Sequence, residues 1–368
     1  MKKYRLSALY LLVIVLLLAN CVREIDFQQD QADQTDLVVT GIFTDGAGPH
    51  ILRLNRPGNY NKQVFPFVTG ASVRLTDDLG NVFHYQEITP AGKDPFYQLV
   101  AVKGAVGRSY SLEIDLPGGE QFRSQPQIMP EPFPLDSTEA HGEWIYSNTA
   151  NGSVVREPFA LVYARTKAPA QPKGHYLHWD SEAIYLFNEI NPKPYNHINP
   201  YGSSRQCIVN NRINDQLVAI ADLSKYAPGG VVYENVGKRK IDNAFEQKVA
   251  FAVYQRSVSR EAYEYWEKVN KLLTATGTIF DSPPAAVAGN IENLTHPDRP
   301  ALGFFEVGAA DTARVFSGNG QLGNEFLLKG EPYCQLDWSI WPPVNHTECD
   351  DCLTWLKGSY YELPWWWQ

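Results

Sequence analysis

Short stretches in which hydrophobic and polar residues alternate run through the first third of the chain, and they predict β-strands. The clearest are residues 37–43, 50–54, 71–76 and 108–114. Because side chains of a strand point alternately to its two faces, each stretch describes a strand with one buried face. Gly- and Asp-rich turns separate them. Short strands at this spacing are typical of a β-sandwich of immunoglobulin-like or transthyretin-like type.

Prolines crowd together after these strands, at positions 126, 130, 132 and 134. Such a run indicates a stiff linker over residues 126–135, and we place a domain boundary there. The N-terminal sandwich then covers residues 36–125, and a larger β-rich domain covers residues 136–368. Further strand patterns in that domain occur at residues 159–165, 175–187, 216–221, 231–235 and 250–257.

One segment, at about residues 258–273, has the helical period instead. Ser259 or Ser257 can cap its N-terminus, and Lys268 and Lys271 lie near its C-terminus, where cations are favoured. Its apolar residues recur every three or four positions: Ala262, Tyr265, Trp266, Val269, Leu272 and Leu273. This spacing predicts an amphipathic helix that buries one stripe. We therefore expect a mainly β protein with one amphipathic helix that packs on a sheet.

The first 21 residues have the form of a lipoprotein signal peptide. A basic start precedes an uncharged apolar run at residues 6–18, and Leu18-Ala19-Asn20-Cys21 follows. We expect cleavage before Cys21, lipid (palmitate) on its thiol, and a polar tether over residues 21–35. The alternatives are an ordinary signal peptide and an uncleaved anchor, although the apolar run is short for a span of about 20 residues.

The charge balance narrows the choice of partners. The chain holds 32 Lys and Arg against 41 Asp and Glu, and signal-peptide cleavage would remove Lys2, Lys3 and Arg5. An acidic body argues against nucleic acid or anionic lipid as the main partner, because both attract clusters of cations. We expect the protein to contact the membrane only through the lipid on Cys21.

Four further cysteines, an even number, favour two disulfides in an exported chain: Cys207, Cys334, Cys349 and Cys352. The sequence leaves all three pairings open. Cys349 and Cys352 have the spacing of a redox pair or of half a zinc site, and both alternatives are less favoured.

The sequence contains few candidate catalytic or metal-binding residues. His178 and Asp180 share one face of a predicted strand, which gives at most two ligands of a metal site, whereas His175 points to the other face. We favour the interpretation that they are polar positions on a half-exposed strand. The sequence has no Gly-x-Ser-x-Gly elbow, no HExxH motif and no EF-hand loop. It therefore predicts no catalytic residue, no metal site and no cofactor.

Aromatic residues are more informative, because six tryptophans lie in the last 31 residues. Trp365, Trp366 and Trp367 are adjacent, and on a strand they could not all face inward. Trp and Tyr dominate the energetics of many interfaces. We consider these three residues a candidate contact surface, with local packing as an equal alternative.

Several motifs together resemble a known family. They lie at residues 21–27, 70–73, 259–266, 277–285, 289–293, 302–305 and 349–352. This series resembles domain of unknown function 4249, a family of outer-membrane lipoproteins of Bacteroidota. The resemblance implies an outer-membrane location and association with TonB-dependent uptake systems, and it implies no catalytic residue. Asp136-Ser137-Thr138 and Asp311-Thr312-Ala313 also resemble the O-glycosylation acceptor pattern of exported Bacteroidota proteins, with Ser137 and Thr312 as acceptors.

These observations together predict an outer-membrane-anchored lipoprotein with a non-catalytic binding or assembly role, accessory to a TonB-dependent transporter. An alternative is a surface adhesin or glycan-binding structural lipoprotein, and a less favoured one is an enzyme that acts on glycan or peptide. Whether the protein faces the periplasm or the cell surface stays open.

Overall fold

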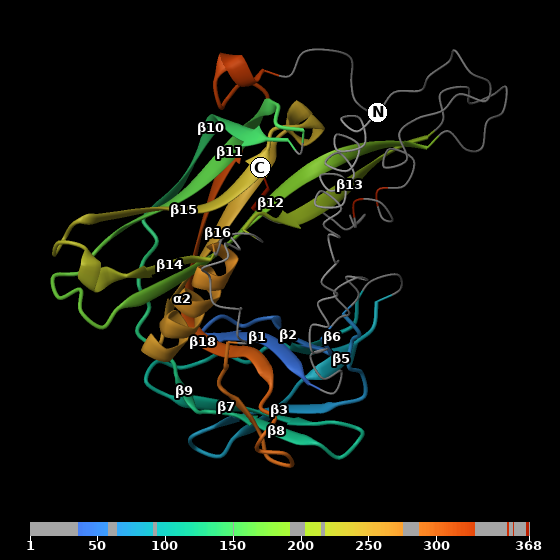
Figure 1. Ribbon diagram of the computed structural model, residues 1–368, viewed down its shortest axis with the longest axis vertical. Helices are drawn as coiled ribbons and strands as arrows, with labels where there is room; N and C mark the ends of the chain where they lie inside the picture. Colours follow the sequence, from blue (N-terminus) through green and yellow to red (C-terminus); the bar gives the residue numbers. More distant parts are fainter. Residues whose placement is uncertain are drawn as a thin grey trace, which may run out of the picture.

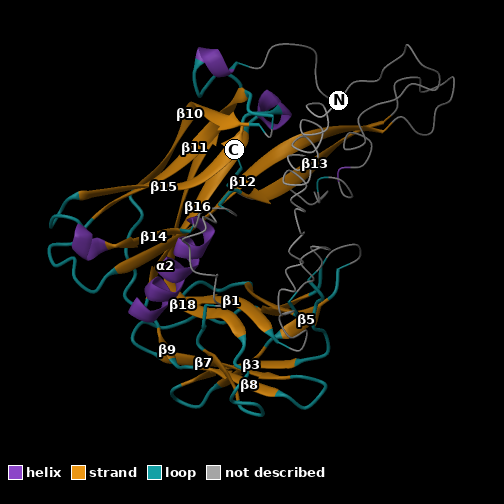
Figure 2. Cartoon of the chain, viewed as in Figure 1, coloured by secondary structure: helices purple, strands orange, loops and turns teal. Residues whose placement is uncertain are grey.

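The computed structural model describes residues 36–57, 65–90, 94–149, 151–191, 203–214, 218–274 and 287–327, together with Cys352, Leu356, Trp366 and Trp367. The prediction of a mainly β protein is confirmed. Within the described residues there are three sheets and one α-helix, α2 (Arg260–Thr274), with three short 3-10 turns, η1 (Leu223–Lys225), η2 (Asn243–Glu246) and η3 (Asn324–Phe326) (Figures 1 and 2).

The largest sheet has nine strands and runs through the whole molecule. Its order along one path is β13 (Ser203–Arg212), β12 (Tyr176–Asn191), β16 (Val249–Val258), β18 (Leu302–Ser317), β1 (Val38–Thr44), β2 (His50–Asn55), β6 (Phe96–Leu99) and β5 (Gln86–Ile88), and β14 (Ala219–Asp222) pairs with β12. Two smaller sheets pack on this long sheet, one at each end, so it forms a layer of two successive sandwiches (Figure 1).

The N-terminal sandwich closes with a six-stranded sheet. This sheet contains β17 (Ile291–Asn293), β8 (Gln121–Ser124), β7 (Ser109–Asp115), β3 (Ser72–Asp77) and β4 (Val82–His84), with β9 (Gln127–Ile128) on β7. The alternation in the sequence correctly predicts which face of β7 is buried, because Tyr110, Leu112 and Ile114 are all buried. They pack against Val39 and Leu52 of the long sheet.

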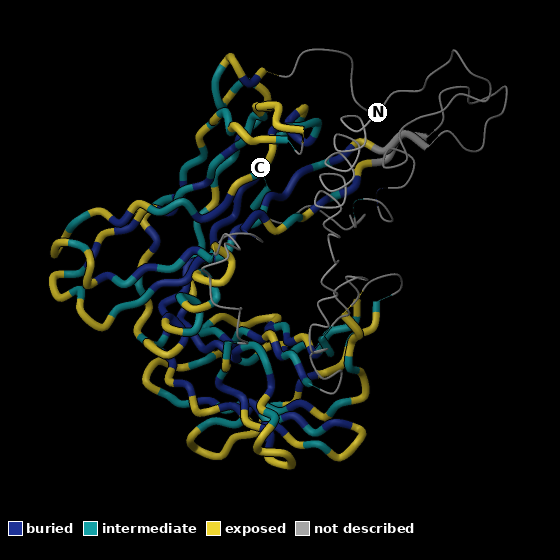
Figure 3. The backbone as a smooth tube through the Cα atoms, in the orientation of Figure 1, coloured by how far each residue is buried: buried dark blue, intermediate teal, exposed yellow. Residues whose placement is uncertain are grey.

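The second sandwich closes with three strands, β10 (Ser137–Asn148), β11 (Val154–Lys167) and β15 (Val231–Lys240). Their inward residues, such as Val162 and Val236, join Trp179 and Phe251 of the long sheet in one buried cluster. Buried residues, coloured dark blue, lie in both sandwiches and along the strands that connect them (Figure 3).

β18 belongs to both sandwiches. Its first half pairs in parallel with β1, from Leu302 opposite Val38 to Gly308 opposite Thr44. Its second half pairs antiparallel with β16. A boundary at residues 126–135 would assign β17 and β18 to the second domain, yet β17 pairs with β8 and β18 with β1.

The proline-rich segment between the sandwiches also contributes to their cores. Met129 is buried in the first core, where its backbone N–H donates to the carbonyl of Arg108 at 2.9 Å. Leu135 is buried in the second core. The backbone N–H of Leu135 donates to the carboxylate of Asp311 on β18 at 2.8 Å. The segment is thus fixed to both sandwiches rather than lying free between them.

Helix α2 begins where the sequence predicts. The hydroxyl of Ser259 accepts a hydrogen bond from the backbone N–H of Ala262 at 3.1 Å, so Ser259 is the cap. The predicted stripe is buried only in its first part. Leu272 and Leu273 are 39% and 54% exposed, so the prediction is wrong for these two residues. The helix contacts the sheet with its first turns, where Ala262 and Tyr263 are buried.

One pair of cysteines lies at disulfide distance, Cys207 on β13 and Cys352. Both are buried in the core of the second sandwich. Because Cys352 pairs with a residue 145 positions away, it is not closed into a redox pair with Cys349. Cys334 and Cys349 lie outside the described residues, as does Cys21.

The pairing of β1 with β18 depends on a glycine. Gly303 has φ of +90°, and a Cβ there would lie 2.0 Å from the carbonyl oxygen of Val39. We expect Gly303→Ala to lower the free energy of unfolding by at least ~2 kcal/mol more than Gly80→Ala, which should cost about 1 kcal/mol. Gly80 is a matched control, because its φ is +82° and nothing lies within 4 Å of its Cβ position.

Urea unfolding followed by circular dichroism measures both values. Equal losses in the two variants would show that backbone strain alone is involved, and that the close approach of Gly303 to β1 contributes nothing.

Candidate functional site

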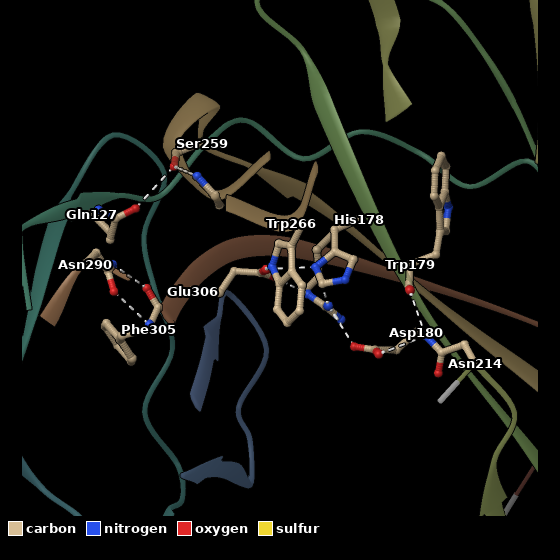
Figure 4. A network of polar contacts seen from close by, with 12 residues as sticks. Gln127, His178, Trp179, Asp180, Asn214, Ser259, Trp266, Asn290, Phe305 and Glu306 are labelled. Carbon is tan, nitrogen blue, oxygen red and sulfur yellow. Dashed lines mark hydrogen bonds and ion pairs between the residues drawn. The ribbon is translucent and has the colours of Figure 1, made fainter. Parts of the chain in front are cut away.

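A network of buried charged residues lies where helix α2 crosses the long sheet (Figure 4). His178 and Asp180 come from β12, Arg256 from β16, Glu306 from β18 and Trp266 from α2. The strand register brings these side chains together, because His178 is directly opposite Arg256. These side chains therefore join three strands and a helix at the point where the two sandwiches meet.

Glu306 is the centre of this network. One carboxylate oxygen, Oε1, accepts a hydrogen bond from Nε of Arg256 at 2.5 Å. The other, Oε2, accepts from the indole N–H of Trp266 at 2.7 Å and lies 2.8 Å from Nδ1 of His178. A carboxylate cannot donate, so we assign the proton of this last contact to Nδ1 of His178. Both oxygens of Glu306 are therefore hydrogen bonded.

Arg256 connects Glu306 to a second carboxylate. Its Nη2 lies 2.7 Å from Oδ2 of Asp180. Asp180 also forms an ion pair with Arg212, and its Oδ1 accepts a hydrogen bond from the side-chain amide of Asn214 at 3.2 Å. The four charged side chains thus alternate in sign along the chain of contacts, so no buried charge is left uncompensated.

Burial makes this pairing energetically important. The side chains of Glu306 and Arg256 are only 1% and 4% exposed. Moving an ion out of water costs several kcal/mol, which only close ion pairs and hydrogen bonds offset. Burial alone raises the pKa of Glu306, but its close contacts with His178 and Arg256 outweigh burial and lower the pKa to about 2. Burial also acts against the charge of Asp180, and Arg256 together with His178 and Arg212 lowers the pKa of that carboxyl.

These properties suit a structural role. A general acid must hold a transferable proton near the working pH, whereas the pKa of Glu306 keeps it ionised there. Its oxygens are already bound by fixed donors from three elements. The arrangement therefore holds α2, β12, β16 and β18 in one relative position.

The sequence found part of this site. The prediction that His178 and Asp180 share a face is confirmed, since both contact Arg256. The interpretation of a half-exposed strand is wrong, because His178 is buried and its neighbours are charged side chains rather than water. In the part of the chain that the structure describes, no three His, Cys, Asp or Glu residues could hold a metal ion together.

The sequence pattern did not predict that Arg256, Glu306 and Trp266 contact one another. The available signal was a charge inside each of two apolar strands, Arg256 in 249–258 and Glu306 in 302–309. A buried charge of this kind requires a partner of opposite charge. Opposite charges on two apolar strands therefore indicate that these strands lie side by side.

The C-terminal tryptophans form a second cluster of interest. Trp366 and Trp367 are half-buried against Phe316 of β18, with Trp367 edge-on at 5.6 Å between ring centroids. The guanidinium of Arg314 lies 4.6 Å from the Trp366 ring, and the Lys248 ammonium 4.1 Å from the Phe316 ring. Residue 366 lies in a turn, so strand alternation does not apply and both rings reach one cluster. Trp365 is outside the described residues.

The two expected glycosylation acceptors lie in strands. Ser137 is the first residue of β10, and Thr312 lies opposite Tyr254 within the long sheet; both are half-buried. Their modification stays a prediction. Among the helices that the structure describes, none is long and apolar enough to span a membrane.

Comparison with known families identifies the chain. The family model for domain of unknown function DUF4249 matches residues 22–314, so the chain belongs to this family. No curated protein matches it.

The solved structures it is matched with include the pullulanase of Anoxybacillus sp. LM18-11, with and without maltotriose, at 10% and 11% identity. Each match covers 60% of this chain and has a TM-score of 0.16. The chain spans about a quarter of those enzymes, since 24% of each is covered. A likeness this weak supports no conclusion about function.

Removing the charge of Glu306 should destabilise the protein strongly. We expect Glu306→Gln to lower the free energy of unfolding by about 3–5 kcal/mol, because Arg256 loses its closest counterion while it stays buried. Glu264→Gln is the matched control: Glu264 forms an exposed ion pair with Arg260 at 3.0 Å, and such pairs contribute about 0.3–0.5 kcal/mol. Equal effects of the two substitutions in urea unfolding would contradict a structural role for the network.

The contribution of Glu306 to the free energy of unfolding should depend on pH, and its pKa gives the direction. The pKa of Glu306 is lower in the folded protein, about 2, than its ordinary value of 4.5. Its contribution is therefore complete above pH 4.5 and is lost as the pH falls towards 2. The wild-type protein should lose more stability over this interval than the Glu306→Gln variant does.

Proposed function

We propose that this member of the DUF4249 family is an exported, lipid-anchored protein of the outer membrane that has a binding or assembly role as the accessory of a TonB-dependent transporter. Cys21 would carry the lipid, and residues 21–35 would give the body its reach. The family resemblance supports this location and this class of partner. The disulfide between Cys207 and Cys352 supports export, because such bonds persist in oxidising compartments.

The observation that carries the binding role is the cluster of Trp366, Trp367 and Phe316. Three large aromatic rings meet there, each half-buried, and two cations lie over ring faces. Aromatic residues and Arg are the side chains most enriched at the centres of protein interfaces. Rings that already pack on a sheet also lose little freedom when a partner binds.

The disulfide contributes to this pre-organisation. Cys352 is held in the core of the second sandwich through Cys207, on one face of the long sheet, whereas Trp366 packs on the opposite face beside Ile184 and Ala250. Cys352 and Trp366 are therefore attached to the sheet on its two opposite faces. A surface that is fixed in this way loses little conformational freedom when a partner docks on it.

Co-purification from native outer membranes tests the proposal. The tagged wild-type chain, solubilised in mild detergent, should recover a TonB-dependent transporter, and Trp366→Ala should reduce that recovery at least tenfold, which corresponds to about 1.4 kcal/mol. Trp144→Ala is a matched control, because the Arg156 guanidinium lies at the same 4.6 Å from the Trp144 ring but on a different sheet. Recovery of no transporter with the wild-type chain would refute the accessory role.

A further inference from the structure

The outward face of the sheet β10–β11–β15 has an unusual composition. In a sandwich the outer face of an antiparallel sheet is normally polar. Here three successive outward residues of β11, Phe159, Leu161 and Tyr163, are apolar or aromatic and only half-buried. Their inward neighbours on β11 form the core of the second sandwich, so packing of that core does not explain the outer residues.

Neighbouring strands extend this apolar stripe into a small platform. Tyr233 of β15 stacks on Tyr163 with ring centroids 4.7 Å apart and planes only 5° from parallel. His141 of β10 meets the Tyr163 ring edge-on, with ring centroids 5.7 Å apart. Tyr233 is 42% exposed although it is held in this stack. The rings are thus fixed before any ligand arrives.

Polar groups surround the stack and are themselves ordered. Nε2 of His141 lies 3.0 Å from the hydroxyl of Tyr233 and 3.3 Å from the carboxylate of Glu139. Arg165 lies 3.7 Å from the same carboxylate.

Glu139 pairs with Arg165. The charges beside Phe159 are also of both signs, because the ammonium of Lys238 lies 6.0 Å from its ring and Glu143 is directly opposite it on β10. These two positive and two negative charges balance, so the platform offers hydrogen-bonding groups without a net charge. That balance favours an uncharged polar ligand over an acidic polymer.

The size of the platform favours a small ligand over a protein partner. The distance from Phe159 to Tyr163, four residues along the strand, is about 13 Å, and three strands measure about 10 Å across. This area of roughly 130 Å² is far below the ~800 Å² that each partner buries in a stable protein complex. It matches a few linked rings of a small polar molecule.

We propose that this face is a binding site for short neutral oligosaccharides. The apolar C–H face of a sugar ring would pack on the exposed surface of Tyr233, and its hydroxyl groups would reach Glu139, Arg165 and His141. This site is separate from the C-terminal cluster of Trp366 and does not depend on a transporter.

The test uses the full-length chain, purified in a detergent without a sugar head group. Neutral trisaccharides of glucose, xylose, mannose and galactose are titrated individually by calorimetry, with a trisaccharide of glucuronic acid as the charged comparison. We expect at least one neutral trisaccharide to bind with a dissociation constant below 1 mM and the charged one to bind at least tenfold more weakly.

Three variants locate the site. Tyr233→Ala should weaken binding at least tenfold, because the stacking ring is lost, whereas Tyr233→Phe keeps the ring and should stay within threefold of wild type. Tyr146→Ala is the matched control, since Tyr146 is a more exposed tyrosine, at 64%, on β10 of the same sheet. Urea unfolding of each variant confirms that it is folded.

The outcomes that overturn the proposal are distinct. They are no binding of any neutral trisaccharide at 10 mM, equal binding of the charged one, or binding that Tyr233→Ala and Tyr146→Ala weaken to the same extent. None of these results bears on the transporter, whose recovery is measured with other variants.

Discussion

The position of β18 constrains the whole molecule. Residues 38–44 and 302–308 pair in parallel although more than 250 positions separate them in the chain. We expect such a contact to form late in folding, because closing a long loop costs entropy before the pairing repays it. The same strand then continues into the second sandwich beside β16. The two sandwiches therefore share one strand and are not independent units joined by a linker.

The charge network fixes the register of that strand. A shift of β18 by one residue would turn Glu306 into the apolar core and bring Phe305 or Val307 to Arg256. Buried ion pairs often add little stability compared with apolar packing, but a misplaced buried charge is very costly. Glu306 and Arg256 thus select one alignment of β12, β16 and β18. The surface proposed at Trp366 packs on Phe316 of β18, so its position depends on that alignment.

The sequence predicted those features that depend on local pattern. Alternation identified β7, and the helical period with Ser259 identified α2, because both reflect which face of a single element is buried. The pairing of β1 with β18 was not predicted, since an apolar stretch does not specify its partner. Leu272 was predicted to be buried because periodicity gives the apolar side of a helix, whereas the length of the sheet beneath decides how far it is covered. The exposed stack of Tyr163 and Tyr233 required the register of β11 against β15.

Because β18 belongs to both sandwiches, we expect them to open as one cooperative unit. Native-state hydrogen exchange of the full chain in low denaturant tests this most directly, by comparing the amide of Leu112 in β7 with that of Val162 in β11. We expect both amides to exchange through the same opening, with equal free energies and equal dependence on denaturant. A lower opening free energy for one sandwich while the other stays protected would contradict the claim.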